Sequence, residues 1–505
     1  MRKIIRDLIH GYVEIDDSIE EIINTLHYQR LKDICQLTAQ HVFPSATHNR
    51  FEHSLGVMYL SRKALNSLKP LLEEKYNIDK DMYDRLYWHL TFASLLHDVG
   101  HAPFSHLGER YYREEEIKKE ISETIRAQKM QEPFSDDVFS EGTPHELMSC
   151  YIILKKYVEI LSKLNNTGSS VDFELICRCI LGNQYKSSHK WLENIIIGLL
   201  NSNTIDTDKL DYLMRDAYMT GVNVPLIDTT RLFRNIYINP ITKEITFHHR
   251  SLPVIQSIID SRDSLYLWVY NHHISVYTDF IVEFYIKHLI ANYENKSKFV
   301  DKMDPNDFFS CNAICNGLVS DSNLKNKLKE PLPYILNNKG NISNYTKKIF
   351  PQLFERKFLK PLWKTIYEHK QFLENNIQDV TVREKLIDSL CRKDYAYRRY
   401  IVKILINECN LAHGDVFIVP RSNKFYFLNP ESLFRVHIDD HDERIETLLP
   451  QKKFSDLYND VSFYIFGPKE KLDQVKTKFI EVVNRLLPSK DGLSDNAVNL
   501  RWFKV

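Results

Sequence analysis

Residues 95–106 read LLHDVGHAPFSH, and they follow the apolar run YWHLTFASLLH at residues 87–97. A run that is apolar on all sides is typical of a helix buried at the centre of a helical core. The helix is expected to end near Gly100, because Pro103 follows shortly after it. His97 and Asp98 therefore lie at the inner edge of that core. Burial of an Asp beside a His costs free energy unless the two groups are paired or bind a metal ion.

Helical periodicity extends over most of the first 290 residues. Apolar residues recur at steps of three and four in three further segments, residues 53–68, 204–219 and 254–290. The segment 111–143 is charged and rich in Ser, Asp, Glu and Pro, and we expect it to form an exposed excursion.

From about residue 291 the pattern changes to short apolar runs flanked by turn residues. Three of these runs are expected to be strands, at residues 415–419, 424–428 and 461–466, and a helical stretch follows at 469–487. The prediction is a mainly α protein, with a helical domain at residues 1–290 and a smaller α+β part at 291–505.

Composition restricts the class of protein. The chain has 505 residues, 43% of them apolar, and its 67 Lys and Arg equal its 67 Asp and Glu. Such a balance argues against a protein whose whole surface binds nucleic acid or a membrane. The most apolar run, residues 194–201, is too short to span a bilayer, and no signal peptide is evident. The eight cysteines lack zinc-ribbon spacing, so we expect reduced thiols and a cytoplasmic location.

Four residues stand out as candidate metal ligands, namely His53, His97, Asp98 and Asp208. Imidazole nitrogens and carboxylate oxygens together form a ligand set suited to a divalent ion such as Fe, Mn or Zn, with Mg as a further candidate. A single His-Asp dipeptide is more often a hydrogen-bonded pair, and for the dipeptide alone this alternative stays open. The neighbouring histidine- and aspartate-rich motifs favour the metal.

Four motifs carry a resemblance to a known family. They are HNRFEHSLGV at 48–57, LLHDVGHAPFSH at 95–106, PHE at 144–146 and DTDKLDYLMRD at 206–216. Together they resemble the deoxynucleoside triphosphate triphosphohydrolases of the HD superfamily, with similarity over roughly Lys3–His273. The resemblance implies an HD phosphohydrolase domain at residues 1–290 and a regulatory or oligomerisation region at 291–505. The SAM domain that precedes the HD domain in animal members is not expected.

The resemblance also implies roles for the histidines and carboxylates. His53, His97, Asp98 and Asp208 match the family's metal ligands, and Asp208 is chosen because the ligand directly precedes the Lys of the DKxDY motif. A metal-activated water would then separate the deoxynucleoside from tripolyphosphate.

Three further histidines, His101, His106 and His145, match those that surround the α-phosphate in the family. Glu109 stands where animal members have Asp. The hypothesis is that His106, oriented by Glu109, and His101 act as acid and base, with His145 in support.

Candidate substrate residues lie at helical spacing. Lys209, Tyr212 and Asp216 share one helix face, and Arg50 lies one turn before His53. Arg262, Tyr266 and Tyr270 step by four. Such faces are also typical of core or solvated helices. The resemblance assigns phosphate and sugar contacts to Arg262 and Tyr270, and contacts with the 3′-hydroxyl and the deoxyribose to Gln36 and Leu37.

Regulation by a nucleotide is expected to differ from that of animal members. Asn24 replaces an Asp that reads guanine there, Lys32 replaces an Arg, and Arg6 replaces an Asn. An amide cannot pair with the guanine edge as a carboxylate does. We therefore expect no strict requirement for GTP. The resemblance to the family still implies an activating nucleotide and a homo-oligomer, either a dimer or a tetramer.

Two other functions remain open at this point. One is an HD phosphohydrolase that acts on a different nucleotide phosphoester. The other is a nucleotide-sensing or nucleic-acid-binding assembly with weak catalysis, to which the basic clusters at residues 356–364 and 392–399 would contribute. Clusters of this kind are more often solvated surface, so single-stranded nucleic acid is the less favoured partner.

Overall fold

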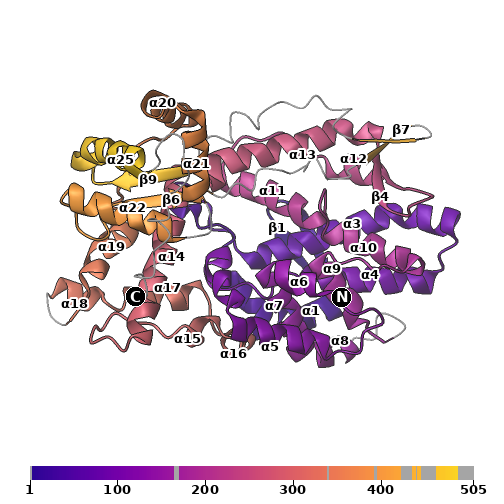
Figure 1. Cartoon of the computed structure of the whole chain (residues 1–505). Coiled ribbons are helices and arrows are strands. Elements are labelled where there is room, and N and C mark those ends of the chain that lie inside the picture. The colour runs from indigo at the N-terminus through magenta and orange to yellow at the C-terminus, as the bar shows by residue number, and fades with distance from the viewer. Residues whose placement is uncertain are drawn as a thin grey trace. The chain divides into compact units, whose positions relative to one another are not determined.

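The computed structural model describes residues 3–163, 170–337, 341–391, 395–421, 435–438, 441–444 and 462–486. It is mainly α, as expected (Figure 1). The chain forms two compact units. The first comprises Met1–Trp268, Met303–Glu330 and Tyr426–Pro450, and the second comprises Val269–Lys302, Pro331–Phe425 and Gln451–Val505. The domain division expected at residue 290 stays a prediction.

The first unit contains most of the helices. They are α1 (Asp17–Ile23), α2 (Leu26–Gln29), α3 (Arg50–Tyr76), α4 (Lys80–Leu96), α5 (Glu115–Arg126), α6 (Asp136–Glu141), α7 (Pro144–Ile152), α8 (Val158–Lys163), α9 (Phe173–Leu181), α10 (Trp191–Leu200), α11 (Thr207–Thr220), α12 (Thr229–Arg234), α13 (Leu252–Leu265), α15 (Asn306–Phe309), α16 (Cys311–Cys315) and α17 (Asp321–Lys329). Its strands are β1 (Lys3–Asp7), β2 (Gly11–Ile15), β3 (Ile236–Ile238), β4 (Ile245–His248), β7 (Arg435–Ile438) and β8 (His441–Arg444).

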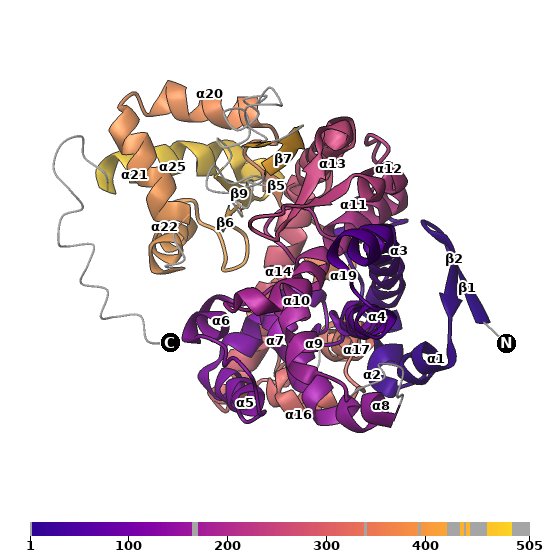
Figure 2. The same ribbon diagram turned by 90° about the vertical axis from the view of Figure 1, so that its right-hand side faces the viewer.

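Helices α3 and α4 pack against each other and form the centre of this unit (Figure 2). α3 begins at an Asn49 cap, whose side chain accepts hydrogen bonds from the amides of Phe51 and Glu52 at 3.1 and 3.2 Å. α4 is capped by Asp79 and is buried over Leu90–Leu96, as its apolar sequence predicts. Helix α11 crosses α3, so the motif at 206–216 comes next to the motif at 48–57.

The first 290 residues contain one element that was not expected and one segment that differs from its expectation. Residues Lys3–Ile15 form an antiparallel hairpin in which Val13 and Ile15 are buried. Its short alternating strands lack a helical period. The segment 111–143 is not a simple exposed excursion. It contains α5 and α6, and Ile121 and Ile125 of α5 are buried four residues apart while the charged face stays in water.

The long segment expected at residues 254–290 is not one helix. It divides into α13, a π-helical turn (Tyr266–Tyr270) and α14 (His273–Glu294). The His272 ring caps α14 by accepting a hydrogen bond from the Ile274 amide at 3.2 Å. The boundary between the two units lies within the π-helical turn, after Trp268. Tyr270 therefore belongs to the second unit, whereas Arg262 belongs to the first.

The second unit combines helices with a small sheet. Its elements are α14, α18 (Leu332–Leu336), α19 (Asn344–Phe354), β5 (Lys360–Pro361), α20 (Ile366–Asn376), α21 (Val380–Cys391), α22 (Tyr395–Glu408), β6 (Phe417–Pro420), β9 (Phe463–Gly467) and α25 (Leu472–Leu486). The antiparallel sheet has the order β5-β9-β6. The strands expected at 415–419 and 461–466 and the helix expected at 469–487 are thus confirmed in outline. The strand expected at 424–428 lies outside the described residues.

No helix in the described part of the chain has both the length and the apolar content needed to cross a bilayer.

The turn after α4 is in contact with the backbone of α7 at Gly100. A Cβ atom at this position would lie 2.3 Å from the Ser149 amide nitrogen and 2.5 Å from the His145 carbonyl oxygen. The Gly100 amide donates to Ser149 Oγ at 2.8 Å, and that hydroxyl donates to the His97 carbonyl at 2.6 Å. The glycine therefore brings the start of α7 against the HDVGH turn.

We predict that Gly100→Ala lowers the free energy of unfolding by about 2–3 kcal/mol, because the backbone atoms it meets cannot move aside. Chemical denaturation followed by circular dichroism measures the change. Gly198→Ala is the matched control, since a Cβ there would meet its nearest atom only at 3.9 Å. Equal stability of the two variants would contradict the close approach at Gly100.

Candidate active site

Three segments of the first unit bring four candidate ligands together. His53 comes from α3, His97 and Asp98 from the turn after α4, and Asp208 from the first turn of α11. Ligand atoms of His53, His97 and Asp98 lie within 4.8 Å of one another. Asp208 Oδ1 is 3.0 Å from His53 Nε2 and 3.6 Å from His97 Nε2. The four residues predicted from the sequence thus form one cluster.

The two imidazoles of this cluster are held so that their Nε2 atoms face inward. His53 Nδ1 donates to Asp211 Oδ2 at 2.7 Å, and His97 Nδ1 donates to the Ser94 carbonyl at 2.8 Å. Metal-binding histidines usually hold their second ring nitrogen in this way. His97 Nε2 is buried and has no hydrogen-bond partner among the described residues. This residue set fits a divalent metal ion.

Charges of the cluster compensate one another. Burial alone would raise the pKa of Asp98, but His101, His97 and Arg50 hold it well below its usual range. Burial lowers the pKa of His53, yet its bonds to Asp208 and Asp211 outweigh this and raise it to about 10. The pocket therefore favours positive charge among its carboxylates, which a metal ion would supply.

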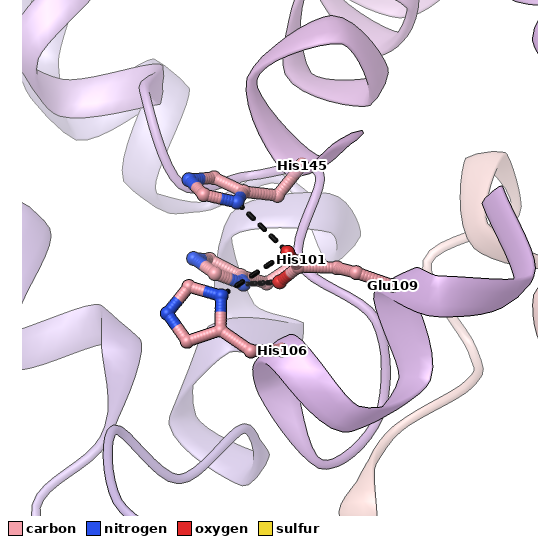
Figure 3. Close-up of side chains that lie close together, drawn as sticks. All are labelled: His101, His106, Glu109 and His145. Atoms are coloured by element: carbon pink, nitrogen blue, oxygen red, sulfur yellow. Dashed lines mark hydrogen bonds and ion pairs between the residues drawn. The ribbon is translucent and has the colours of Figure 1, made fainter. Parts of the chain in front are cut away.

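A second group lies beside the first and consists of His101, His106, Glu109 and His145 (Figure 3). Glu109 is at its centre. Its Oε2 accepts from His106 Nδ1 at 3.1 Å and from His145 Nδ1 at 2.9 Å, and its Oε1 lies in close contact with His101 Nδ1. The rings of His101 and His145 stack with centroids 4.1 Å apart. The four predicted acid–base residues are therefore neighbours.

The three imidazoles of this group have different environments. Burial lowers the pKa of His101 to about 4, whereas the charge of Glu109 overcomes burial and raises that of His145 to about 9. His106 is the exposed member, with 69% of its side chain accessible. At neutral pH the group thus combines a neutral and a cationic imidazole.

The two groups are connected through Asp98. Its Oδ1 is 3.0 Å from His101 Nε2, and its Oδ2 accepts from Arg50 Nη1 at 2.9 Å. Arg50 Nε also donates to Ser105 Oγ at 3.2 Å, and Ser105 donates to the Cys35 carbonyl at 2.7 Å. Arg50 is therefore already paired, and it joins the loop before α3 to the HD turn.

Gln36 and Leu37 follow Cys35 in that same loop. Gln36 is only 9% exposed, and its Oε1 has no hydrogen-bond partner among the described residues. Leu37 is half-buried. A buried amide oxygen without a donor is costly, and a ligand hydroxyl would satisfy it.

The other predicted substrate residues are arranged less uniformly. The Lys209 ammonium donates to Asp206 and to the Ser202 carbonyl, and Asp216 pairs with His48 Nε2 at 2.7 Å. Tyr212 is half-buried near Tyr266. Its pKa is raised well above the usual range, mainly by burial and to a smaller extent by Tyr266. The Arg262 guanidinium lies over the Tyr266 ring at 4.5 Å. Tyr270 lies in the second unit.

Several supporting residues were not identified from the sequence. Asp211 and Arg215 lie within the DKLDYLMRD motif, but spacing alone did not indicate that they support His53. His10, Asp7 and Asp321 are remote in sequence, and only the fold brings them near. Asp321 accepts from the amides of Phe104 at 2.7 Å and Cys35 at 3.1 Å, which secures the turn that carries Ser105.

The model of the HD domain family matches residues 50–153 of this chain. This segment contains His53, His97, Asp98 and all four residues of the Glu109 group. HD domains bind divalent metals, and the cluster described above agrees with this.

Several proteins are similar to the chain over a longer range. A protein of Dictyostelium discoideum named deoxynucleoside triphosphate triphosphohydrolase SAMHD1 homolog is 29% identical over 310 residues, covering 61% of this chain and 53% of that protein. An uncharacterized protein of Mycoplasma genitalium is 28% identical over 64% of this chain and 68% of its own length. The deoxynucleoside triphosphate triphosphohydrolase SAMHD1 of Gallus gallus is 31% identical over 227 residues, which cover 44% of this chain and 34% of that protein. The chain thus spans about half the length of the first of these relatives.

A solved structure of a hypothetical protein from Aquifex aeolicus has the same fold. It aligns with a TM-score of 0.59 at 20% sequence identity, and the alignment covers 95% of this chain and 100% of that one. Residues 50–153 match the HD domain model, and the predicted resemblance of the chain to deoxynucleoside triphosphate triphosphohydrolases of the HD superfamily is confirmed by the similar proteins from Dictyostelium discoideum and Gallus gallus.

Proposed function

We propose that this protein hydrolyses deoxynucleoside triphosphates to a deoxynucleoside and tripolyphosphate. One observation carries the proposal: Asp98 joins a four-residue metal-ligand cluster to an acid–base group, with His101 Nε2 3.0 Å from its Oδ1. The names of the similar proteins from Dictyostelium and chicken support the choice of substrate.

His53, His97, Asp98 and Asp208 would hold the ion, which is Fe, Mn, Zn or Mg. When bound, a divalent ion lowers the pKa of water and polarises a phosphoryl oxygen. The protein's part is to fix the Nε2 atoms of both imidazoles through Asp211 and the Ser94 carbonyl. The Asp208 side chain is 40% exposed, so the cluster is open to solvent at this residue, and we expect the substrate to approach there.

The bond to be broken joins the α-phosphorus to the 5′ oxygen of the sugar. Water adds to phosphorus, and the departing 5′ oxygen needs a proton. The raised pKa of His145 keeps this imidazole protonated at neutral pH, so it is suited to donate that proton. His101, with its lowered pKa, is suited to accept or share a hydrogen bond instead. This assignment gives His145 the acid–base role that the sequence hypothesis gave to His106, and His106 and Glu109 would support it.

Recognition of the sugar and phosphates would involve the loop before α3. The unsatisfied Oε1 of Gln36 is suited to accept the 3′-hydroxyl hydrogen, with Leu37 against the deoxyribose. Arg50, Lys209, Tyr212, Asp216, Arg262 and Tyr270 remain predicted substrate residues. An activating nucleotide and a dimer or tetramer remain predictions from the resemblance, and a cytoplasmic location remains a prediction from the cysteine pattern.

We predict that metal-stripped protein is inactive and that Mn²⁺ restores release of tripolyphosphate and deoxynucleoside, without a requirement for GTP. His97→Ala should lower the rate by about 100-fold or more, because the ion loses a ligand. Chromatography of products from all four deoxynucleoside triphosphates measures both. The exposed His189→Ala serves as control. Release of pyrophosphate or orthophosphate alone would show that a different phosphoester bond is cut, and strict GTP dependence would refute the argument from Asn24.

We predict that Gln36→Leu reduces the preference for a deoxynucleoside triphosphate over its 2′,3′-dideoxy analogue by about tenfold, the effect of one lost hydrogen bond to a buried group. The ratio of kcat/KM values for the two substrates measures this. Gln40→Leu is the matched control, because the hydrogen bond of Gln40 within the described part of the chain goes to Cys35 Sγ, a weak acceptor, at 3.3 Å. An unchanged ratio in the Gln36 variant would exclude a contact with the 3′-hydroxyl.

A third prediction concerns pH and His145. Its pKa is raised from 6.5 to about 9, so its stabilising effect is complete below pH 6.5 and is lost as pH rises through about 9. The difference in unfolding midpoint between the wild type and His145→Gln should therefore shrink over this range. The pKa shift of His145 corresponds to roughly 3 kcal/mol of stability at most.

His89→Gln is the control for this experiment. Burial lowers the pKa of His89, so the corresponding difference should not shrink as pH rises through that range. A constant difference for His145 as well would contradict its pairing with Glu109.

A further inference from the structure

The N-terminal hairpin β1–β2 contacts the support of the metal centre, although it supplies no candidate ligand. Asp7 Oδ1 accepts from the amides of Ile9 and His10 at 2.8 Å each, which fixes the turn between the two strands. From this turn, His10 Nε2 donates to Asp211 Oδ1 at 2.6 Å. Asp7 Oδ2 accepts from Arg215 Nη1 at 2.9 Å.

The Asp211 carboxylate is the point where these contacts meet. Its Oδ2 accepts from His53 Nδ1 at 2.7 Å and from Arg215 Nε at 2.8 Å. Its Oδ1 accepts from His10 at 2.6 Å and from Arg215 Nη2 at 3.0 Å. Its side chain is fully buried. The hairpin thus supplies His10, one of the four donors to Asp211. It also supplies Asp7, the second carboxylate that pairs with Arg215.

The surroundings leave Asp211 little room. A Cβ atom at Gly56 of α3 would lie 1.9 Å from Asp211 Oδ1 and 2.5 Å from Arg215 Nη2. The carboxylate therefore rests directly on the backbone of α3, one turn beyond His53. Its orientation is set by the donors around it, since both oxygens are in use.

We propose that the hairpin is a positioning element of the metal centre, in which His10 and Asp7 hold Asp211 against His53 Nδ1 so that His53 Nε2 faces the ion. Outer partners of a metal-binding histidine fix its ring and its tautomer, and their loss weakens metal binding. The inference rests on the proposed metal centre and adds a part of the chain outside the matched HD segment. His10 and Asp7 are positioning residues and do not touch the ion.

His10→Phe is the test variant, because it keeps a ring against Tyr59, whose centroid is 5.0 Å away, and removes the N–H donor. His10→Gln keeps a donor and should behave like the wild type. The matched control is His288→Phe in the second unit. His288 also stacks on a tyrosine, Tyr345 at 5.2 Å, and its Nε2 lies 2.7 Å from Ser343 Oγ.

The measurement is titration of metal-stripped full-length protein with Mn²⁺ alone, with free Mn²⁺ followed by its electron paramagnetic resonance signal. We expect His10→Phe to bind about tenfold more weakly, and the His10→Gln and His288→Phe variants to stay within twofold of the wild type. Asp7→Asn, which loses the charge facing Arg215, should also weaken binding and replaces His10→Phe if circular dichroism shows that variant unfolded. If His10→Phe, or Asp7→Asn in its place, binds Mn²⁺ within twofold of the wild type, the proposal is overturned.

The outcomes separate this inference from the proposed function. If the wild type binds Mn²⁺ but releases no tripolyphosphate, the substrate assignment fails, and the affinities of the variants still decide the role of the hairpin. If the wild type binds no Mn²⁺, the metal centre fails and the hairpin proposal fails with it.

Discussion

A buried carboxylate, that of Asp98, imposes the strictest condition on the first unit. An anion removed from water costs several kcal/mol unless cations and hydrogen-bond donors surround it. Here Arg50 Nη1 at 2.9 Å and His101 Nε2 at 3.0 Å lie against it, with His97 Nε2 at 3.4 Å and His53 Nε2 at 3.7 Å. Because these groups belong to α3 and to the turn after α4, neither segment can shift without exposing the charge. A metal ion would strengthen the same arrangement.

One construction recurs in both histidine groups. A buried acceptor takes the Nδ1 hydrogen of four imidazoles and leaves their Nε2 atoms for chemistry. Asp211 does this for His53, the Ser94 carbonyl does it for His97, and Glu109 does it for both His106 and His145. Burial lowers the pKa of His101, whereas the charge of Glu109 raises the pKa of His145. One proton acceptor and one proton donor are what acid–base catalysis requires.

Much of the fold follows from local patterns. The buried half of α4 was predictable because its run is apolar on all sides, and helix α11 was predictable because its apolar residues recur with a helical period. The hairpin at Lys3–Ile15 was not recognised, since strands of five residues carry too few positions to define a period. α13 and α14 were expected as one helix because the periodicity continues, whereas a π-helical turn and the His272 cap separate them. The buried side of α5 was hidden by its many charged residues.

The four metal-ligand candidates and the four members of the Glu109 group were named from motifs, because residue type and order along the chain carry that information. Their partners were not. Asp211 and Arg215 belong to a recognised motif, but their contact with His53 depends on the close crossing of α3 and α11 at Gly56. His10, Asp7 and Asp321 are 201, 208 and 217 positions from the residues they bind, Asp211, Arg215 and Phe104. Local sequence determines which groups can do chemistry, whereas the orientation of each group depends on hydrogen bonds across such separations, and only the packed tertiary structure brings those donors and acceptors together.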